Sequence, residues 1–390
     1  MKPFKRSYLI SLIIFLSLSF TFSAGFFARD ALAFFTHTDK DFPILDEVYT
    51  LLVERGFDPL PAPPALEYGM IRGMLQAYGD PHTVFLEPVQ TELESDSLRG
   101  KFGGIGVELG KDAEGFFILY PFTDGPASKA GILEGDRLLG AGDLVVDKNT
   151  SLDSIVAAIR GKVGEAVTLT IARPPDYQSI KIPVVRSEIT LPSVSWHLEP
   201  SEPRLGVIQI NLIAASSADE VIRAAKDLQS RGATHFILDL RNNGGGLLDA
   251  GVDVARLFLQ DGDVIQQQYR DQDVKTYKVD HPGELAEIPL VILVNQNTAS
   301  AAEIIAGALQ AHHRATLIGA PTYGKDTIQL VFNLKDKSSF HVTAAHWWIP
   351  GLEFPRQDSG LEPDILITET ADDPDLPIRT AIETLFSGPG

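Results

Sequence analysis

Apolar residues recur at helical spacing in two early segments, and this pattern predicts helices over residues 44–55 and 66–77. A proline-rich stretch, DPLPAPPA, separates the two segments and cannot continue either helix. The string GDPHTVFLEP that follows predicts a turn and an extended exit, in which we interpret Asp80 as a capping residue and His82 as structural. We therefore expect residues 36–98 to form a helical region.

From about residue 100 to residue 175 the pattern changes to short strands of alternating polarity around one or two helices. The segment opens with a glycine-rich stretch, GKFGGIGVELG, and contains an amphipathic helix pattern in SLDSIVAAIRG. Phosphate binding is not expected at these glycines, because neither a Lys–Ser/Thr pair nor a helix follows them.

The next pattern alternates strand and helix, as in LGVIQINLIAASSADEVIRAAKDLQSRGATHFILDLRNNGGGLLDAGVDVARLFL. This alternation predicts a sheet covered by helices. The buried strand predicted over residues 236–240 is interrupted by RNNGGG. Three consecutive glycines permit close backbone approach to a ligand and leave N–H groups exposed. A tight strand-to-helix turn explains the glycines equally well.

A second such unit lies further along the chain, where an apolar strand over residues 291–294 is followed by a capping turn and a helix over residues 299–311. Ser300 therefore lies at a helix N-terminus. Unpaired N–H groups and the positive end of the helix dipole favour negative charge on its hydroxyl or on a bound carbonyl. The structural alternative is an ordinary helix N-cap.

A nucleophilic serine needs a base, and His312 and His313 lie at the far end of the same helix, about three turns away. Lys325 is the better candidate, because apolar neighbours would lower its pKa by desolvation. We expect two adjacent strands of one sheet to bring the start of the strand 327–332 beside the end of the strand before Ser300. Gln329 shares a side of the extended strand with Lys325 and is placed to orient the amine. The alternative is a solvated loop lysine.

Composition excludes several classes of function. The chain has 390 residues, 44% of them hydrophobic, and a net charge of -19, which argues against a nucleic-acid partner. The absence of cysteine excludes disulfides and thiolate catalysis. No HExxH string, paired histidines or acidic cluster suggests a metal, so we expect no metal and no cofactor.

The first 35 residues predict export. Lys2, Lys5 and Arg6 precede an almost uncharged stretch over residues 8–28, and Ala33 is a candidate cleavage site. The apolar stretch is long for a signal peptide and long enough to span a bilayer. We interpret residues 1–35 as a signal peptide or membrane anchor, with slight preference for the anchor. Either outcome predicts an extracytoplasmic location, in the periplasm or at the cell exterior, membrane-anchored or secreted.

The string NQNTASAAE followed by GKDTIQ resembles the tail-specific, or C-terminal processing, serine peptidases of family S41. The resemblance implies that Ser300 is the nucleophile, Lys325 the base and Gln329 the glutamine that orients it. Two positions depart from the family pattern: Thr298 replaces a serine, which is harmless, and Asp326 replaces the second glycine of GKG. A carboxylate beside the base would raise the pKa of the base if the two approached, although neighbours on a strand point to opposite faces.

The string DLRNNGGG resembles the family's DLRxNxGG, with Gly244 where proline is frequent. This resemblance implies that backbone N–H groups of Gly245 or Gly246 join that of Ala301 in an oxyanion hole. The strings YGMIRGMLQAYGDPHT and GLEPDI extend the resemblance to roughly residues 40–370.

The strings GKFGGIGVELG and GPASKAGILEGDRLLGAGDLVV resemble a PDZ domain of the bacterial, permuted type, although the loop GAGDLVVDK departs from its pattern. Backbone N–H groups at the glycines would receive a terminal carboxylate, and the strand edge would pair with the peptide. The two isoleucines of the second helix either line the side-chain groove or belong to the core. The predicted peptide-binding residues are Gly104, Ile105, Gly106, Val107, Ile155 and Ile159.

Together these patterns predict a mixed α/β (α+β) fold with five parts. They are the membrane or signal segment 1–35, the helical region 36–98 packed on the peptidase, a PDZ domain 99–176, a βα-alternating, crotonase-like peptidase core 177–370, and a C-terminal tail 371–390.

The predicted function is that of an exported serine endopeptidase that binds unstructured C-terminal tails and hydrolyses peptide bonds through a Ser/Lys acyl-enzyme. The expected partners are such protein substrates and the membrane, and homo-oligomerisation is left open. One alternative is a catalytically silent PDZ scaffold at the membrane, which Asp326 favours. A hydrolase of small esters or amides is a weaker alternative, because the PDZ strings count against it.

Overall fold

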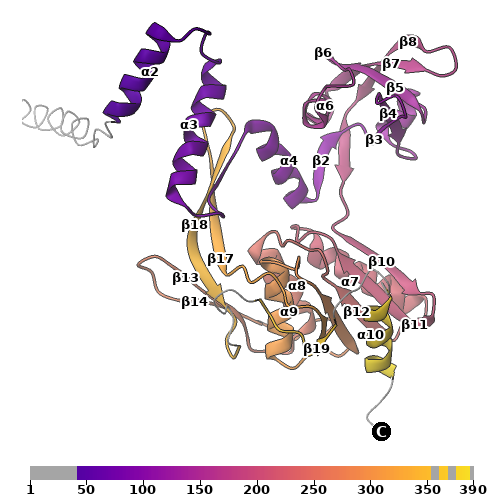
Figure 1. The fold of residues 1–390 in the computed structure, drawn as a ribbon. Helices are drawn as coiled ribbons and strands as arrows, with labels where there is room; N and C mark the ends of the chain where they lie inside the picture. The colour runs from indigo at the N-terminus through magenta and orange to yellow at the C-terminus, as the bar shows by residue number, and fades with distance from the viewer. Residues whose placement is uncertain (1–41, 353–359, 368–374, 387–390) are drawn as a thin grey trace, which may run out of the picture. The chain divides into compact units, whose positions relative to one another are not determined.

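The computed structural model describes residues 42–352, 360–367 and 375–386 (Figure 1). The chain divides into two compact units, with the boundary after Gly69. The predicted signal or anchor segment lies outside the described residues. Within the described ranges, no helix combines the length and the apolar character needed to cross a bilayer.

The first helices are α2 (Pro43–Arg55) and α3 (Pro63–Tyr78), which agree with the two predicted helices to within three residues at each end. Both begin at prolines, which the first turn of a helix tolerates because its N–H groups have no partner within the helix. Neither helix has a fully buried residue.

The main sheet has six strands in the order β10-β11-β12-β15-β16-β19, of which β10, β11, β12 and β19 are labelled in Figure 1. All neighbouring pairs are parallel except β10 and β11, which are antiparallel. The strands are β10 (Val194–Glu199), β11 (Glu202–Ile210), β12 (His235–Asp239), β15 (Leu290–Val294), β16 (Thr316–Gly319) and β19 (Ile365–Leu366).

Helices cover both faces of this sheet. Successive strand residues point to opposite sides, so an apolar strand gives each face apolar side chains that pack against helices. Phe236 and Leu238 of β12 pack in a core with α7 (Ser217–Ser230), α8 (Leu248–Phe258) and α9 (Ala301–Ala311). Ile237, between them, packs in a separate core with α10 (Leu376–Phe386). The structure thus confirms the predicted sheet covered by helices.

A second sheet has the order β1-β18-β13-β14, and β17 also pairs with β18. Its strands are β1 (Val84–Leu86), β13 (Asp263–Tyr269), β14 (Lys275–Lys278), β17 (Thr327–Asn333) and β18 (Ser339–Trp348), and α4 (Pro88–Arg99) follows β1. The expectation that β17 shares a sheet with β15 is wrong. β16 occupies the place beside β15, and the chain then crosses to the second sheet, where β17 pairs with β18 from Thr327 opposite His346 to Asn333 opposite Ser339.

In the sequence, the elements between α4 and β10 form a domain with its own hydrophobic core. Its sheet has the order β3-β4-β5-β7-β8, with β6 paired to β5, and β2 pairs separately with β9. Strand β3 is at one edge of this sheet. The elements are β2 (Lys101–Gly104), β3 (Val107–Lys111), β4 (Phe117–Pro121), α5 (Pro126–Ala130), β5 (Asp136–Ala141), β6 (Leu144–Val145), α6 (Leu152–Ile159), β7 (Ala166–Arg173), β8 (Gln178–Val185) and β9 (Ser187–Thr190).

Candidate active site

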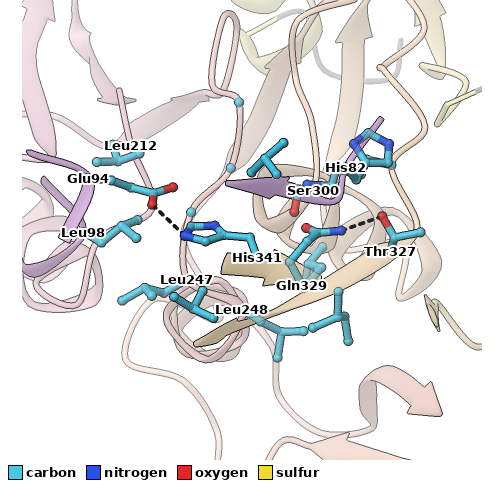
Figure 2. A pocket seen from close by; sticks show the side chains of 18 of the residues that line it. His82, Glu94, Leu98, Leu212, Leu247, Leu248, Ser300, Thr327, Gln329 and His341 are labelled. Atoms are coloured by element: carbon cyan, nitrogen blue, oxygen red, sulfur yellow. Dashed lines mark hydrogen bonds and ion pairs between the residues drawn. The ribbon is translucent and has the colours of Figure 1, made fainter. Parts of the chain in front are cut away.

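A cavity of about 590 Å³ brings together side chains and backbone from α4, the turn after β12, the start of α9, and β17 and β18. Figure 2 shows this cavity, with Ser300 and Gln329 on one side and a Glu94–His341 pair on the other. Of the predicted catalytic and oxyanion-hole residues, five line it directly: Gly245, Gly246, Ser300, Lys325 and Gln329.

Ser300 occupies the N-cap position of α9 with backbone angles φ 55° and ψ -121°. A positive φ in a residue with a Cβ costs on the order of 1–3 kcal/mol, and it persists only where the surroundings impose it. Here the Ser300 N–H donates to Glu303 Oε2 at 2.8 Å. Ser300 thus lies in a strained turn directly before α9 and lines the cavity.

Lys325 lies on the connection between the two sheets, and burial lowers the pKa of its amine from the ordinary value of 10.5. The charges of Asp80, Glu303 and Glu94 act in the opposite direction and raise this pKa. Asp326 is not among these charges. Its carboxylate pairs instead with His346 Nδ1 at 3.0 Å, so the acid next to the lysine has its own partner.

Glu303 connects the two predicted catalytic residues. Its buried carboxylate accepts hydrogen bonds from the backbone N–H groups of Ser300 (2.8 Å), Gly324 (2.7 Å) and Lys325 (3.0 Å), and from the Thr322 hydroxyl. Burial raises the pKa of Glu303, while these four hydrogen bonds act to lower it. Sequence reasoning gave Glu303 no role, although the spacing S-x-x-E at a helix start is a capping-box signal.

The glycine turn packs directly against the nucleophile. Gly245 has φ +100°, and a Cβ added there would lie 2.9 Å from Ser300 Cβ and 2.8 Å from the Ala299 carbonyl oxygen. Only glycine fits such an approach. The Gly245 N–H donates to Asn243 Oδ1 at 2.8 Å, whereas the N–H groups of Gly246 and Ala301 have no acceptor in the part of the chain that the structure describes.

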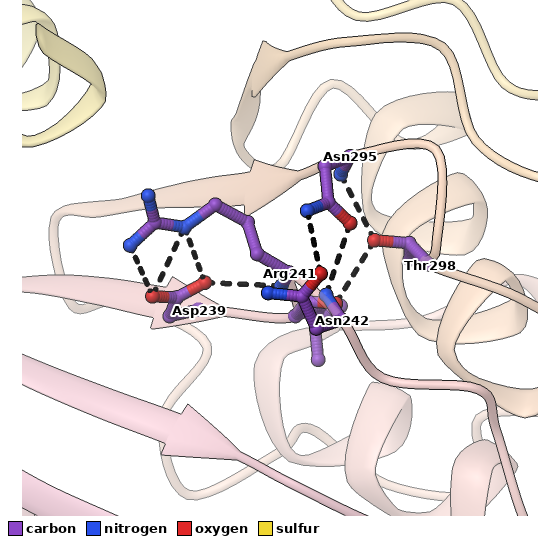
Figure 3. A network of polar contacts seen from close by, with 6 residues as sticks. Asp239, Arg241, Asn242, Asn295 and Thr298 are labelled. Atoms are coloured by element: carbon purple, nitrogen blue, oxygen red, sulfur yellow. Dashed lines mark hydrogen bonds and ion pairs between the residues drawn. The ribbon is translucent and has the colours of Figure 1, made fainter. Parts of the chain in front are cut away.

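A network of polar contacts fixes this turn to the turn before Ser300 (Figure 3). Asp239 holds Arg241 through paired hydrogen bonds of 2.7 to 3.2 Å. Asn242 exchanges two hydrogen bonds with Asn295, at 2.9 and 3.0 Å. The buried Thr298 hydroxyl accepts from the Asn295 N–H and donates to the Leu240 carbonyl, two bonds that a serine hydroxyl can also make.

The Gln329 amide nitrogen donates to Thr327 Oγ1 at 3.0 Å (Figure 2) and to Thr343 Oγ1 at 3.3 Å. Both amide hydrogens are therefore used, and the amide carbonyl oxygen is the group left to accept a hydrogen bond from an amine.

Four further residues belong to the site: Asp80 and His82, which the sequence analysis interprets as structural only, and Glu94 and His341, which it does not name. Asp80 caps its turn as predicted, accepting from His82 N and Thr83 Oγ1, but its charge also acts on the lysine. His82, Glu94 and His341 line the cavity, although none lies near the serine motif in sequence. No local pattern indicates a role in the site for Glu94 or His341.

A smaller cavity of about 110 Å³ lies on the domain of residues 99–190. Four of the predicted peptide-binding residues line it: Ile105, Gly106, Val107 and Ile159. Val156 lines it as well and was missed. Gly104 is not part of the lining, and Ile155 is fully buried in the domain's core, which is the second of the two interpretations given for it above. Helical spacing does not distinguish a groove face from a core face when the two are one residue apart.

Comparison with known proteins gives consistent results. Residues 204–367 match the profile of "Peptidase family S41", and residues 117–173 match that of the PDZ domain. The chain is 36% identical over 306 residues to a carboxyl-terminal-processing protease of Picosynechococcus sp., covering 77% of this chain and 73% of the relative.

It is also 32% identical over 321 residues to the carboxy-terminal processing protease CtpA of Bacillus subtilis, covering 82% of this chain and 67% of the relative. Among solved structures, a photosystem II D1 C-terminal processing protease aligns with a TM-score of 0.45 and 29% identity, over 83% of this chain and 86% of that one.

Proposed function

Because this chain belongs to the carboxyl-terminal-processing proteases of peptidase family S41, we propose that it cleaves proteins with unstructured C-terminal tails through a Ser/Lys acyl-enzyme. The observation that carries this proposal is the shared cavity. Ser300 in a strained turn, Lys325 with a pKa lowered by burial, and the glycine turn all line it.

In the proposed reaction, Ser300 Oγ attacks the peptide carbonyl carbon while neutral Lys325 takes the hydroxyl proton. The carbonyl oxygen becomes an oxyanion that accepts hydrogen bonds from the N–H groups of Ala301 and Gly246, or of Gly245 once it leaves Asn243. As the C–N bond breaks, the lysine ammonium returns the proton to the leaving amine. Water then attacks the ester by the same route, with the lysine again as base. Gln329 holds the amine through its free carbonyl oxygen.

Tail capture is assigned to the PDZ domain. Its β3 strand is at a sheet edge, and Val107 of this strand lines the small cavity with Gly106 and Ile159. An extended peptide added to such an edge gains backbone hydrogen bonds, while its side chains enter the groove. We propose an extracytoplasmic location, supported by the basic and then apolar character of residues 1–35.

The direct test is Ser300→Ala. We expect the wild type to hydrolyse a denatured protein ending in apolar residues, and the variant to be at least about a thousandfold slower. Ser230→Ala, at an exposed helix end, is the matched control and keeps wild-type activity. If Ser300→Ala were as active as the wild type, the assignment of Ser300 as the nucleophile would be refuted. A wild type that forms no acyl-enzyme would instead support the silent scaffold.

The glycine turn gives a second prediction. Gly245→Ala forces a Cβ against Ser300 and Ala299 at a positive φ, so we expect kcat to fall by about a hundredfold or more. Gly73→Ala, at an exposed position of α3 where nothing lies within 4 Å of an added Cβ, is the control. Steady-state kinetics of the two variants decide the matter, and equal activities would contradict the assigned role of the turn.

A further inference from the structure

The wall of the active-site cavity opposite Ser300 carries a carboxylate that the proposed mechanism does not use. Glu94 projects from α4 into the cavity, and its side chain is 43% exposed. Its partner in the described part of the chain is His341, whose Nε2 lies 3.3 Å from Glu94 Oε2 (Figure 2).

A chain of hydrogen bonds decides how much of this charge the histidine compensates. The Thr91 hydroxyl donates to the Leu86 carbonyl at 3.2 Å, so Thr91 Oγ1 accepts from the Ser339 hydroxyl at 2.9 Å. In this arrangement Ser339 Oγ accepts from His341 Nε2 at 3.0 Å, which assigns the proton of a neutral His341 to Nε2. A neutral His341 therefore directs its one N–H at Ser339 and shares it with Glu94 only at the longer distance. The Glu94 charge remains largely uncompensated.

The catalytic lysine does not compensate it either. Glu94 is one of three acids, with Asp80 and Glu303, whose charges raise the pKa of Lys325. In the neutral form that the proposed mechanism requires, Lys325 offers these acids no positive charge. His82 is the other titratable group on the wall. At a pH where both histidines are neutral, the cavity of the working enzyme carries excess negative charge.

Much of the remaining wall is apolar, including Leu98, Leu247 and Leu248. A lysine or arginine side chain suits such a cavity, since its methylene stem packs on apolar surface while its charged end reaches a carboxylate. We propose that Glu94 is a specificity residue that favours substrates with a basic side chain close to the bond to be cleaved. This inference rests on the proposed peptidase function.

The test uses the full-length protein and a quenched fluorescent peptide that it cleaves. Each of the three residues on either side of the cleaved bond is replaced in turn by lysine, norleucine or glutamate, and kcat/KM is measured at pH 8. We expect one position at which lysine exceeds norleucine by about fivefold and glutamate falls below it by a similar factor, the scale of a half-exposed ion pair.

In Glu94→Gln this preference disappears, whereas Glu92→Gln, an equal charge change at an exposed position of the same helix, retains it. Glu94→Gln also moves the acid limit of kcat/KM to lower pH, because a negative charge that raises the pKa of Lys325 is gone. A lysine preference that survives Glu94→Gln, an unchanged acid limit, or no preference at any position overturns the assignment. If the wild type cleaves no peptide at all, the proposed function fails together with it.

Discussion

Replacement of Lys325 by methionine is expected to lower kcat by about a thousandfold or more, because the side chain keeps its length but can no longer accept a proton. The same change should stabilise the fold at neutral pH. Burial depresses the pKa of Lys325, so the folded state disfavours the ammonium that the unfolded chain carries. This gain shrinks as the pH rises towards 10.5, where the unfolded chain also loses the proton.

Lys335→Met serves as the control, because Lys335 is exposed in the turn between β17 and β18 and should change neither property. Urea unfolding at two pH values and steady-state hydrolysis measure both effects. A Lys325→Met enzyme that keeps more than a tenth of the wild-type kcat would contradict the assignment of the base.

Glu303→Gln is expected to have the second largest effect. One carboxylate oxygen becomes an NH₂ group that cannot accept, so some of the four donors, which are Ser300 N, Gly324 N, Lys325 N and the buried Thr322 hydroxyl, lose their acceptor. Each buried donor left unpaired costs about 1–3 kcal/mol. We expect the free energy of unfolding to fall by at least about 2 kcal/mol, and kcat to fall about a hundredfold because both catalytic residues lose their shared anchor.

The acid limit of kcat/KM, which does not depend on stability, distinguishes a direct effect of Glu303 on the lysine from a general loss of folded protein. The Glu303 charge raises the pKa of Lys325, so its removal should shift the acid limit of kcat/KM to lower pH. Glu284→Gln, at an exposed surface ion pair, is the control and should shift nothing. An unchanged acid limit in a folded Glu303→Gln enzyme would show that Glu303 does not act on the base.

Local sequence patterns predicted the strand-turn-helix unit around Ser300 well. The apolar run of β15 and the residues before α9 carry their signals within twenty positions, so the helix start was placed within two residues of the observed Ala301. The sheet that contains β17 could not be predicted in this way. β17 belongs to this sheet because it pairs with β18, and the sequence pattern of neither strand predicts that pairing.

The residues of the site also differ in whether a local sequence pattern could predict them. Ser300 and Lys325 could be predicted because a short motif carries each of them, and Glu303 had a local capping signal. Glu94 and His341 could not, because α4 and β18 are about 250 residues apart in the chain and meet only in the folded protein. The burial that lowers the pKa of Lys325 is likewise a property of the assembled cavity.

The most direct test of the account is the pH dependence of acylation in a single turnover, followed by rapid quenching and detection of the ester on Ser300. A buried lysine base predicts a rate that rises with pH to a plateau, with a midpoint below the ordinary lysine pKa of 10.5, and no such rise in Lys325→Met. A midpoint at or above 10.5, or the same profile in wild type and Lys325→Met, would contradict it.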